Sequence, residues 1–206
     1  MNTGIAIVPE IKALHRLVEL QRSLLQIASL SPLLGTEENL PHITLLQGKT
    51  VAPLCSHSEL EYLASQLQTM SDGVSLRISQ FEYIEGGWYF LKIHRDDWLQ
   101  TLHDTAFAIC RDRLIVDHNE TNDFLGYNEE QKQNHLQYGY RYIGTQFTPH
   151  FTIGRTLDKK RSTHEEKFLE IVNTEISNFV IYPDRFTLYR MGENGSHALE
   201  LDSTLI

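Results

Sequence analysis

The sequence has few cysteines and no long apolar run. Its two cysteines, Cys55 and Cys110, belong to no Cys-x-x-Cys pair, so a disulfide framework is excluded. No apolar run approaches the ~18 residues of a membrane-spanning helix. The first residues also lack the basic segment that opens a secretion signal. We therefore expect a cytoplasmic protein with no membrane segment.

Basic residues are also scarce relative to acidic ones. Lysine and arginine number 18 against 27 aspartates and glutamates, which gives a formal net charge of −9. A protein that coats nucleic acid by releasing counterions needs the opposite balance, so the net charge argues against this class. A local basic pocket for one nucleotide or a short RNA end remains compatible with the sequence.

Several common catalytic motifs are missing from the chain. There is no phosphate-binding P-loop, no Gly-x-Gly-x-x-Gly and no serine nucleophile elbow. His57, His118 and His164 each begin a His-x-Glu sequence, but none is followed by the Pro-Cys-x-x-Cys of zinc deaminases. The tract 117–120 is suited either to holding a cation or to a solvated loop, and we favour the loop. The sequence thus predicts no metal and no cofactor.

The chain alternates helical and strand patterns over its whole length. Its 206 residues, 41% of them hydrophobic, suffice for one domain or for two small lobes that share a core. We expect a single domain over 1–206 that is a monomer. A polar stretch at 117–137 predicts an insertion or lid with a short helix at 129–136. The helix near residue 58 is expected to open with a Ser58-x-x-Glu61 capping box.

One motif occurs twice. Pro41-His42-Ile43-Thr44-Leu45 and Pro149-His150-Phe151-Thr152-Ile153 share the pattern Pro-His-apolar-Thr-apolar. Two chance occurrences are expected on the order of once in a hundred thousand sequences, whereas a bare His-x-Thr is uninformative. The further match at 103–105 lies in an expected helix, where residues two apart do not share a face, and we discard it. The repeated pattern therefore indicates function.

The repeated pattern has a direct physical reading. In a strand, residues two apart point to the same face, so each histidine projects together with its threonine while the apolar residues face the core. Histidine titrates near neutral pH, so one imidazole can act as a base and another as an acid. Two threonine hydroxyls can hold a phosphoryl group between them. If the two strands are close, the two imidazoles and two hydroxyls together suffice for metal-free chemistry at a phosphodiester.

With these two motifs, 108 residues apart, the sequence resembles the two-histidine phosphoesterases, which include 2′-5′ RNA ligase-like proteins and cyclic phosphodiesterases. The resemblance implies an α+β fold of two pseudo-symmetric lobes. Each lobe would have a mainly antiparallel sheet flanked by helices, with the active-site cleft between them. It also implies that His42 and His150 are the acid–base pair and that Thr44 and Thr152 bind phosphate. Which histidine is the acid is left open.

Four further residues are candidate substrate contacts. Arg155 follows the second motif, but a regular strand would point it away from the cleft unless a bulge at Gly154 re-aims it. Tyr142 ends an alternating tyrosine series, 138, 140 and 142, that either stacks a base or stabilises a strand. Phe124 and Tyr127 are placed as aromatic residues of the expected lid.

The expected activity is metal-independent hydrolysis of a 2′,3′-cyclic phosphate or a 2′-linked phosphodiester, with a nucleotide or short RNA as substrate. RNA ligase activity is an additional possibility for such a site. Two alternatives stay open. One is cleavage of cyclic or 2′-5′ oligonucleotide signals, and the other is a non-catalytic module that binds RNA or a nucleotide through the same motifs.

Overall fold

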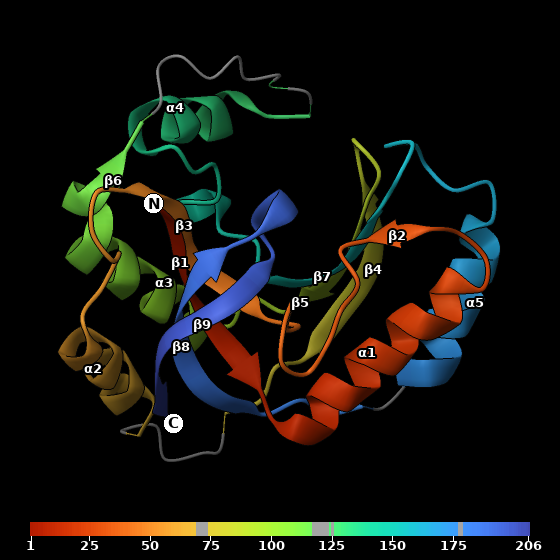
Figure 1. Ribbon diagram of the computed structural model, residues 1–206, viewed down its shortest axis with the longest axis horizontal. Coiled ribbons are helices and arrows are strands. Elements are labelled where there is room, and N and C mark those ends of the chain that lie inside the picture. Colours follow the sequence, from red (N-terminus) through yellow and green to blue (C-terminus); the bar gives the residue numbers. More distant parts are fainter. Residues whose placement is uncertain (69–73, 117–123, 125, 177–178) are drawn as a thin grey trace.

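The computed structural model describes residues 1–68, 74–116, 124, 126–176 and 179–206, and it shows an α+β fold (Figure 1). The helices in these ranges are α1 (Ile11–Leu25), α2 (His57–Gln68), α3 (Asp97–Cys110), α4 (Glu129–Tyr138) and α5 (Glu165–Ile176). The strands are β1 (Asn2–Pro9), β2 (Leu30–Ser31), β3 (Ile43–Thr50), β4 (Ile78–Ile84), β5 (Trp88–Ile93), β6 (Leu114–Ile115), β7 (His150–Thr156), β8 (Pro183–Met191) and β9 (His197–Leu205).

All these strands belong to one antiparallel sheet. Its order is β4-β5-β7-β3-β1-β8-β9, with β2 paired to β7 and β6 paired to β3. The two strands that carry the repeated motif, β3 and β7, are therefore neighbours at the centre of the sheet. They share a single residue pair, Ile43 with Phe151.

The helices pack on the sheet in two groups. In Figure 1, α1 and α5 lie together beside β4, β5 and β7, whereas α2 and α3 lie beside β1, β3 and β8. The core runs through both groups, and it includes Ile43 and Phe151, which are fully buried. Burying apolar side chains of this size contributes about 1.5–3 kcal/mol each, so the central strands are firmly anchored by their inward faces.

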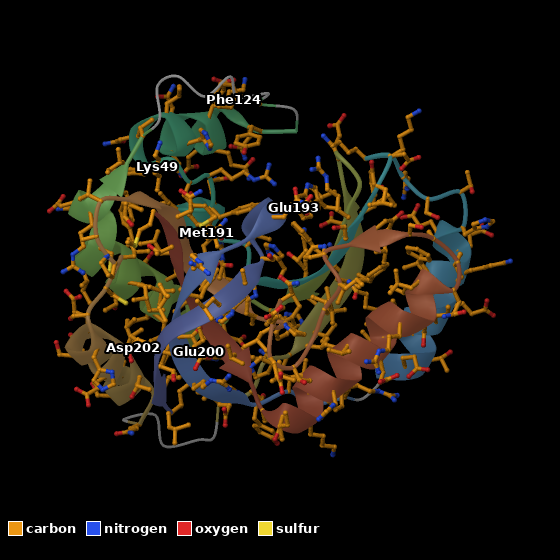
Figure 2. The ribbon with its side chains drawn as sticks, in the orientation of Figure 1. Lys49, Phe124, Met191, Glu193, Glu200 and Asp202 are labelled. Atoms are coloured by element: carbon orange, nitrogen blue, oxygen red, sulfur yellow. The ribbon has the colours of Figure 1, made fainter. Side chains whose placement is uncertain are left out.

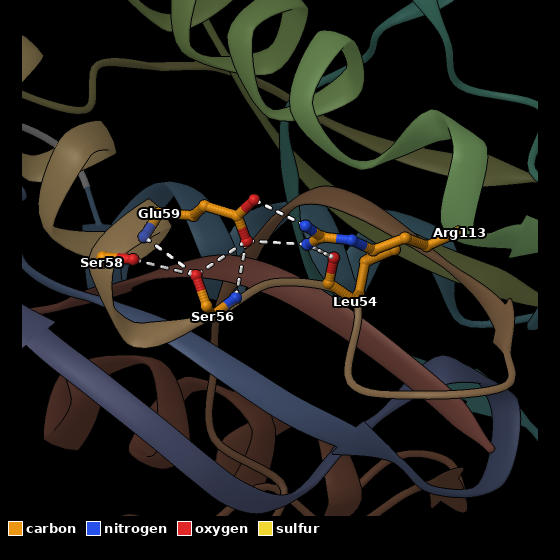
Figure 3. A network of polar contacts seen from close by, with 5 residues as sticks. All are labelled: Leu54, Ser56, Ser58, Glu59 and Arg113. Carbon is orange, nitrogen blue, oxygen red and sulfur yellow. Dashed lines mark hydrogen bonds and ion pairs between the residues drawn. The ribbon is translucent and has the colours of Figure 1, made fainter.

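The start of α2 differs from the predicted one. The helix begins at His57, and the capping box is formed by Ser56 and Glu59 instead of Ser58 and Glu61 (Figure 3). The Ser56 backbone N–H donates to Glu59 Oε2 at 2.7 Å, and the Glu59 backbone N–H donates to Ser56 Oγ at 3.4 Å. Arg113 also donates to both Glu59 oxygens, and this pairing lowers the pKa of Glu59 to about 2. Arg113, from a distant segment, thus selects the earlier of the two overlapping patterns.

The predicted insertion is only partly described. Residues 117–123 and 125 lie outside the described residues, so the lid remains a prediction. The expected short helix is confirmed as α4, which runs two residues further than predicted. It opens with a capping box between Asn128 and Gln131 and ends at Gly139, whose φ of 72° is a conformation that glycine adopts without strain. In the described part of the chain no helix is long and apolar enough to cross a membrane.

The discarded match at 103–105 lies within α3, as predicted. His103 is fully buried, and its Nδ1 donates to the Leu45 carbonyl at 2.7 Å while its Nε2 accepts from the Gly144 backbone N–H at 2.9 Å. Both ring nitrogens are therefore engaged. Its role is to join β3 to the segment that precedes β7.

Candidate active site

The central strand pair brings the four motif side chains together. Ile43 pairs with Phe151 in antiparallel register, so His42 lies beside Thr152 and Thr44 lies beside His150. The four side chains form a cross, with the two histidines on one diagonal and the two threonines on the other. The paired apolar residues point into the core, whereas the histidines and threonines are half-buried on the opposite face. All four line one cavity of about 750 Å³.

Both motif imidazoles are held in the same way. His42 Nδ1 lies 2.7 Å from the Leu40 carbonyl, and His150 Nδ1 lies 2.7 Å from the Thr148 carbonyl, in each case two residues earlier. A carbonyl oxygen only accepts, so Nδ1 must carry the proton and Nε2 is the basic nitrogen. Within the described ranges neither Nε2 has a hydrogen-bond partner. Each ring thus presents a free nitrogen with a fixed tautomer.

The same surroundings favour the neutral form of both rings near pH 7. Burial lowers the pKa of His42 to about 4, although its hydrogen bond to the Leu40 carbonyl opposes this shift. The pKa of His150 is also lowered to about 4, mainly by burial and further by His42 and Arg141. Near neutral pH, protonation of either ring therefore needs a negative charge nearby, which a bound phosphate would supply.

A bulge in β7 brings Arg155 to the cavity. Tyr89 pairs with Gly154 and the next residue, Phe90, pairs with Thr152, so Ile153 is an extra residue in β7. The extra residue reverses the alternation, and Arg155 lines the cavity with Thr152 instead of pointing away from it.

The bulge and the arginine are both held in place. The Ile153 carbonyl accepts a hydrogen bond from buried Gln21 at 2.7 Å, which supports the backbone at the bulge. Arg155 donates to the Gly86 carbonyl at 2.7 Å and lies 4.8 Å from the centre of the Trp88 ring.

The same construction recurs on β3. Ile5 pairs with Leu46 and Ala6 with Thr44, so Leu45 is an extra residue and Gln47 turns to the cavity. Gln47 and Arg155 are each the fifth residue after their motif histidine. Gln47 was not identified from the sequence, because neither bulge is visible in a two-residue alternation.

A buried tyrosine supports the β3 side of the site. The Tyr189 hydroxyl lies 3.3 Å from Thr44 Oγ1 and donates to Gln47 Oε1 at 3.0 Å. Burial raises the pKa of Tyr189, so the hydroxyl keeps its proton. Gly4 makes room for this ring, because a Cβ there would lie 2.5 Å from it.

The cavity is lined mainly by positively charged residues, although the protein as a whole is acidic. Its basic residues are Arg141, Arg155, Lys159, Lys160 and Arg161. Glu85 is the one carboxylate among the described residues that line it. Arg161 is paired with Glu165, whereas no ion pair involves the other four within the described part of the chain. Field lines concentrate in such a cleft, so it attracts anions despite the overall charge of −9.

Aromatic rings line the same cavity around His150. Phe90 is stacked on the His150 ring with centroids 3.8 Å apart, and Tyr142 meets it edge-on at 5.8 Å. The Arg141 guanidinium lies 4.4 Å from the ring centres of both Tyr142 and Tyr127, in a cation–π sandwich. Arg141 was not identified from the sequence, since no motif surrounds it.

The predicted tyrosine strand does not form. Tyr138 is the last residue of α4, and Gly139 separates it from Tyr140 and Tyr142, which line the cavity together with Tyr127. Phe124 is not among the lining residues. It packs beside α4 (Figure 2), with ring centroids 5.6 Å from Tyr127 and 5.7 Å from His135.

Another buried imidazole lies behind His42. The His197 ring is 5.5 Å from that of His42 and is stacked on Tyr189 at 4.6 Å. Its Nε2 lies 2.9 Å from Thr187 Oγ1, and burial lowers its pKa to about 3. In the described ranges no group of three or more His, Cys, Asp or Glu side chains could hold a metal ion. The tract 117–120 lies outside those ranges.

Fold and site together define an α+β protein with a paired histidine–threonine cavity. No family profile matches its sequence, and no curated protein matches it significantly. Among solved structures, one described as "Crystal structure of phosphoesterase" covers 100% of this chain and 97% of its own, with 11% identity and a TM-score of 0.48. The chemistry of the site is therefore inferred from its own side chains.

Proposed function

We propose that the protein is a two-histidine phosphoesterase that hydrolyses a 2′,3′-cyclic phosphate or a 2′-linked phosphodiester of a nucleotide or RNA end. The observation that carries this proposal is the cross of His42, Thr44, His150 and Thr152 on adjacent strands that line one cavity. Two imidazoles with the same tautomer and two hydroxyls suit a phosphoryl group placed between them.

The proposed fold is two-lobed and pseudo-symmetric, with β3 and β7 at the junction. Three likenesses support it. Each motif histidine donates Nδ1 to the carbonyl two residues earlier, each strand has its extra residue three positions after the histidine, and each presents a polar side chain five positions after it. The cavity in front of this junction would then be the cleft between the lobes.

The proposed reaction is an in-line attack of water on phosphorus. One Nε2 takes a proton from the water as the new P–O bond forms, and the other imidazole, protonated in the complex, gives its proton to the departing 2′- or 3′-oxygen. Thr44 and Thr152 donate hydrogen bonds to the non-bridging oxygens, where negative charge develops. After one turnover the two rings have exchanged protonation states, and water resets them. Either histidine can be the base in this scheme.

The proposal is tested with single substitutions. His42→Ala and His150→Ala should each lower kcat on a nucleoside 2′,3′-cyclic phosphate by about 10²–10⁴-fold, because each removes one proton-transfer step. Exposed His94, which does not line the cavity, provides the matched control as His94→Ala. Assays are run in EDTA, with circular dichroism to confirm folding. Full activity in either motif variant would refute the acid–base pair.

A substrate panel separates the related activities. The cavity volume of about 750 Å³ also accommodates the cyclic or 2′-5′ oligonucleotides of the second enzymatic hypothesis. Wild type and His150→Ala are therefore compared on 2′,3′-cyclic nucleotides, cyclic dinucleotides and 2′-5′ linked oligonucleotides, and on RNA ends that a ligase would join. Saturable binding without turnover of any of them would instead identify a binding module.

A further inference from the structure

Two lysines on one wall of the cavity have no function in the reaction described above. Lys159 and Lys160 follow β7, are exposed, and line the cavity. No carboxylate in the described part of the chain forms an ion pair with either lysine. Asp158, the nearest acidic residue in the sequence, instead accepts a hydrogen bond from the Lys160 backbone N–H at 3.1 Å. Both ammonium groups are thus available to an anion.

The segment that carries these lysines is fixed against the β4–β5 hairpin (Figure 1). The Thr156 backbone N–H donates to the Gly87 carbonyl at 2.9 Å, and Thr156 Oγ1 donates to the Lys160 carbonyl at 2.5 Å. Lys159 has a φ of 59°. Its backbone lies so close to Gly87 that a Cβ added to Gly87 would be 2.8 Å from the Lys159 Cα. These contacts fix the backbone from which the two exposed lysine side chains extend.

These lysines lie apart from the motif side chains that would hold the reacting phosphate. They lie beside Thr156, which is four positions after Thr152, but Ile153 is the extra residue of the bulge, so the two threonines are separated by three strand steps, about 10 Å at the usual strand rise. A lysine side chain is shorter than this distance. Trp88 lies between the two places on the cavity wall, with Arg155 over its ring. The wall therefore offers a phosphate site, an aromatic surface and then a second cationic site.

We propose that Lys159 and Lys160 bind the second phosphate of a short RNA whose terminal 2′,3′-cyclic phosphate lies between the histidines. The intervening nucleoside passes Trp88, whose ring and stacked arginine suit a base. This inference rests on the proposed function and gives it a substrate class. The enzyme acts on oligonucleotide ends in preference to mononucleotides, because only an oligonucleotide has an internucleotide phosphate for the lysines.

The test removes one charge from the substrate and two from the protein. The substrates are two dinucleotides with a terminal 2′,3′-cyclic phosphate, one with a normal internucleotide phosphate and one with a neutral methylphosphonate there. Wild type should show a kcat/KM about tenfold higher for the charged dinucleotide. In Lys159→Gln/Lys160→Gln this ratio should fall to about one. Lys12→Gln/Lys167→Gln removes two exposed lysines that do not line the cavity and should keep the wild-type ratio.

A second measurement separates this inference from the proposed function. Calorimetry gives the affinities of the same two dinucleotides as their 3′-phosphates, which require no turnover. If neither the dinucleotides nor a nucleoside 2′,3′-cyclic phosphate is hydrolysed, the proposed function fails, and the affinity ratio alone decides the lysine site. Equal values for the charged and neutral linkages in wild type would overturn the inference. So would a preference that persists in the lysine variant.

Discussion

The two motif histidines have closely similar chemical environments. Each has its Nδ1 proton committed to a carbonyl and a pKa lowered to about 4 by burial. The proposed acid–base catalysis needs them in opposite states, so the difference between them has to come from the substrate. A phosphate that approaches one ring more closely favours the imidazolium there, and the remaining ring stays a base.

This dependence on an anion predicts proton uptake on binding. Sulfate, whose charge is constant between pH 7 and 5.5, should bind more tightly as the pH falls. The free-site pKa values are about 4 and a bound anion raises them, so binding takes up a proton between the two values. Affinity should rise by up to about tenfold per pH unit for each proton. Calorimetry in two buffers of different ionisation enthalpy counts the protons, and a pH-independent affinity would contradict this coupling.

At the scale of elements, the two bulges decide which side chains reach the cavity. Both insert one residue directly after the motif threonine, and the side chain two positions beyond the insertion changes face. In β7 the backbone at Gly154 has a φ of 154°, and a Cβ there would lie 2.9 Å from Leu30 and 3.4 Å from Gln21. Glycine is therefore required for the bulge that places Arg155.

We expect Gly154→Ala to weaken both the fold and the site. The added methyl meets Leu30 in a positive-φ conformation, which should lower the free energy of unfolding by about 1–3 kcal/mol. Arg155 should shift with the strand, so KM for the cyclic phosphate should rise. Urea unfolding and steady-state kinetics measure the two effects.

Gly144→Ala is the matched control for this prediction. Gly144 also has a positive φ of 58°, but nothing lies within 4 Å of an added Cβ. Gly144→Ala therefore measures the stability cost of backbone strain without a close contact to a neighbouring side chain. Equal losses in the two variants would show that contact with Leu30 is unimportant.

These elements determine which parts of the site can be predicted from the sequence. The alternation within each motif correctly predicted which faces of β3 and β7 carry the histidines, because strand periodicity is local. Arg155 was considered only through a possible bulge, and Gln47 was missed, because bulges depend on pairing with β1 and β5. Lys159 and Lys160 belong to a loop whose position is set by Gly87, far away in the sequence. Such placements arise from tertiary contacts that no local pattern records.

At the scale of the molecule, charge is distributed unevenly. The chain has a formal charge of −9, yet five basic residues and one acidic residue are found among the described residues of the cavity. The acidic exterior disfavours long nucleic acids, which would contact more than the cavity. The basic interior favours a short anion that enters it. Long-range electrostatics and the lysine site thus lead to the same substrate class.

The molecule also contains four histidines whose pKa values are lowered by burial, His42, His103, His150 and His197. In the unfolded chain such a group titrates near pH 6.5. Below that pH the unfolded state binds protons that the folded state does not bind. The free energy of unfolding therefore decreases as the pH falls from 6.5 towards 4. Each of the four contributes a slope of up to about 1.4 kcal/mol per pH unit.

Acid unfolding is therefore expected to be steep and to involve several protons. Urea unfolding at pH 7, 6 and 5 measures the slope, and His150→Gln should reduce it by about one proton, because it removes one suppressed titration. His94→Gln alters an exposed histidine and should leave the slope close to that of wild type. Stability that stays constant from pH 7 to 5 would mean that the buried imidazoles are readily protonated in the folded state. The neutral resting site on which the anion-driven acid–base mechanism depends would then be lost as well.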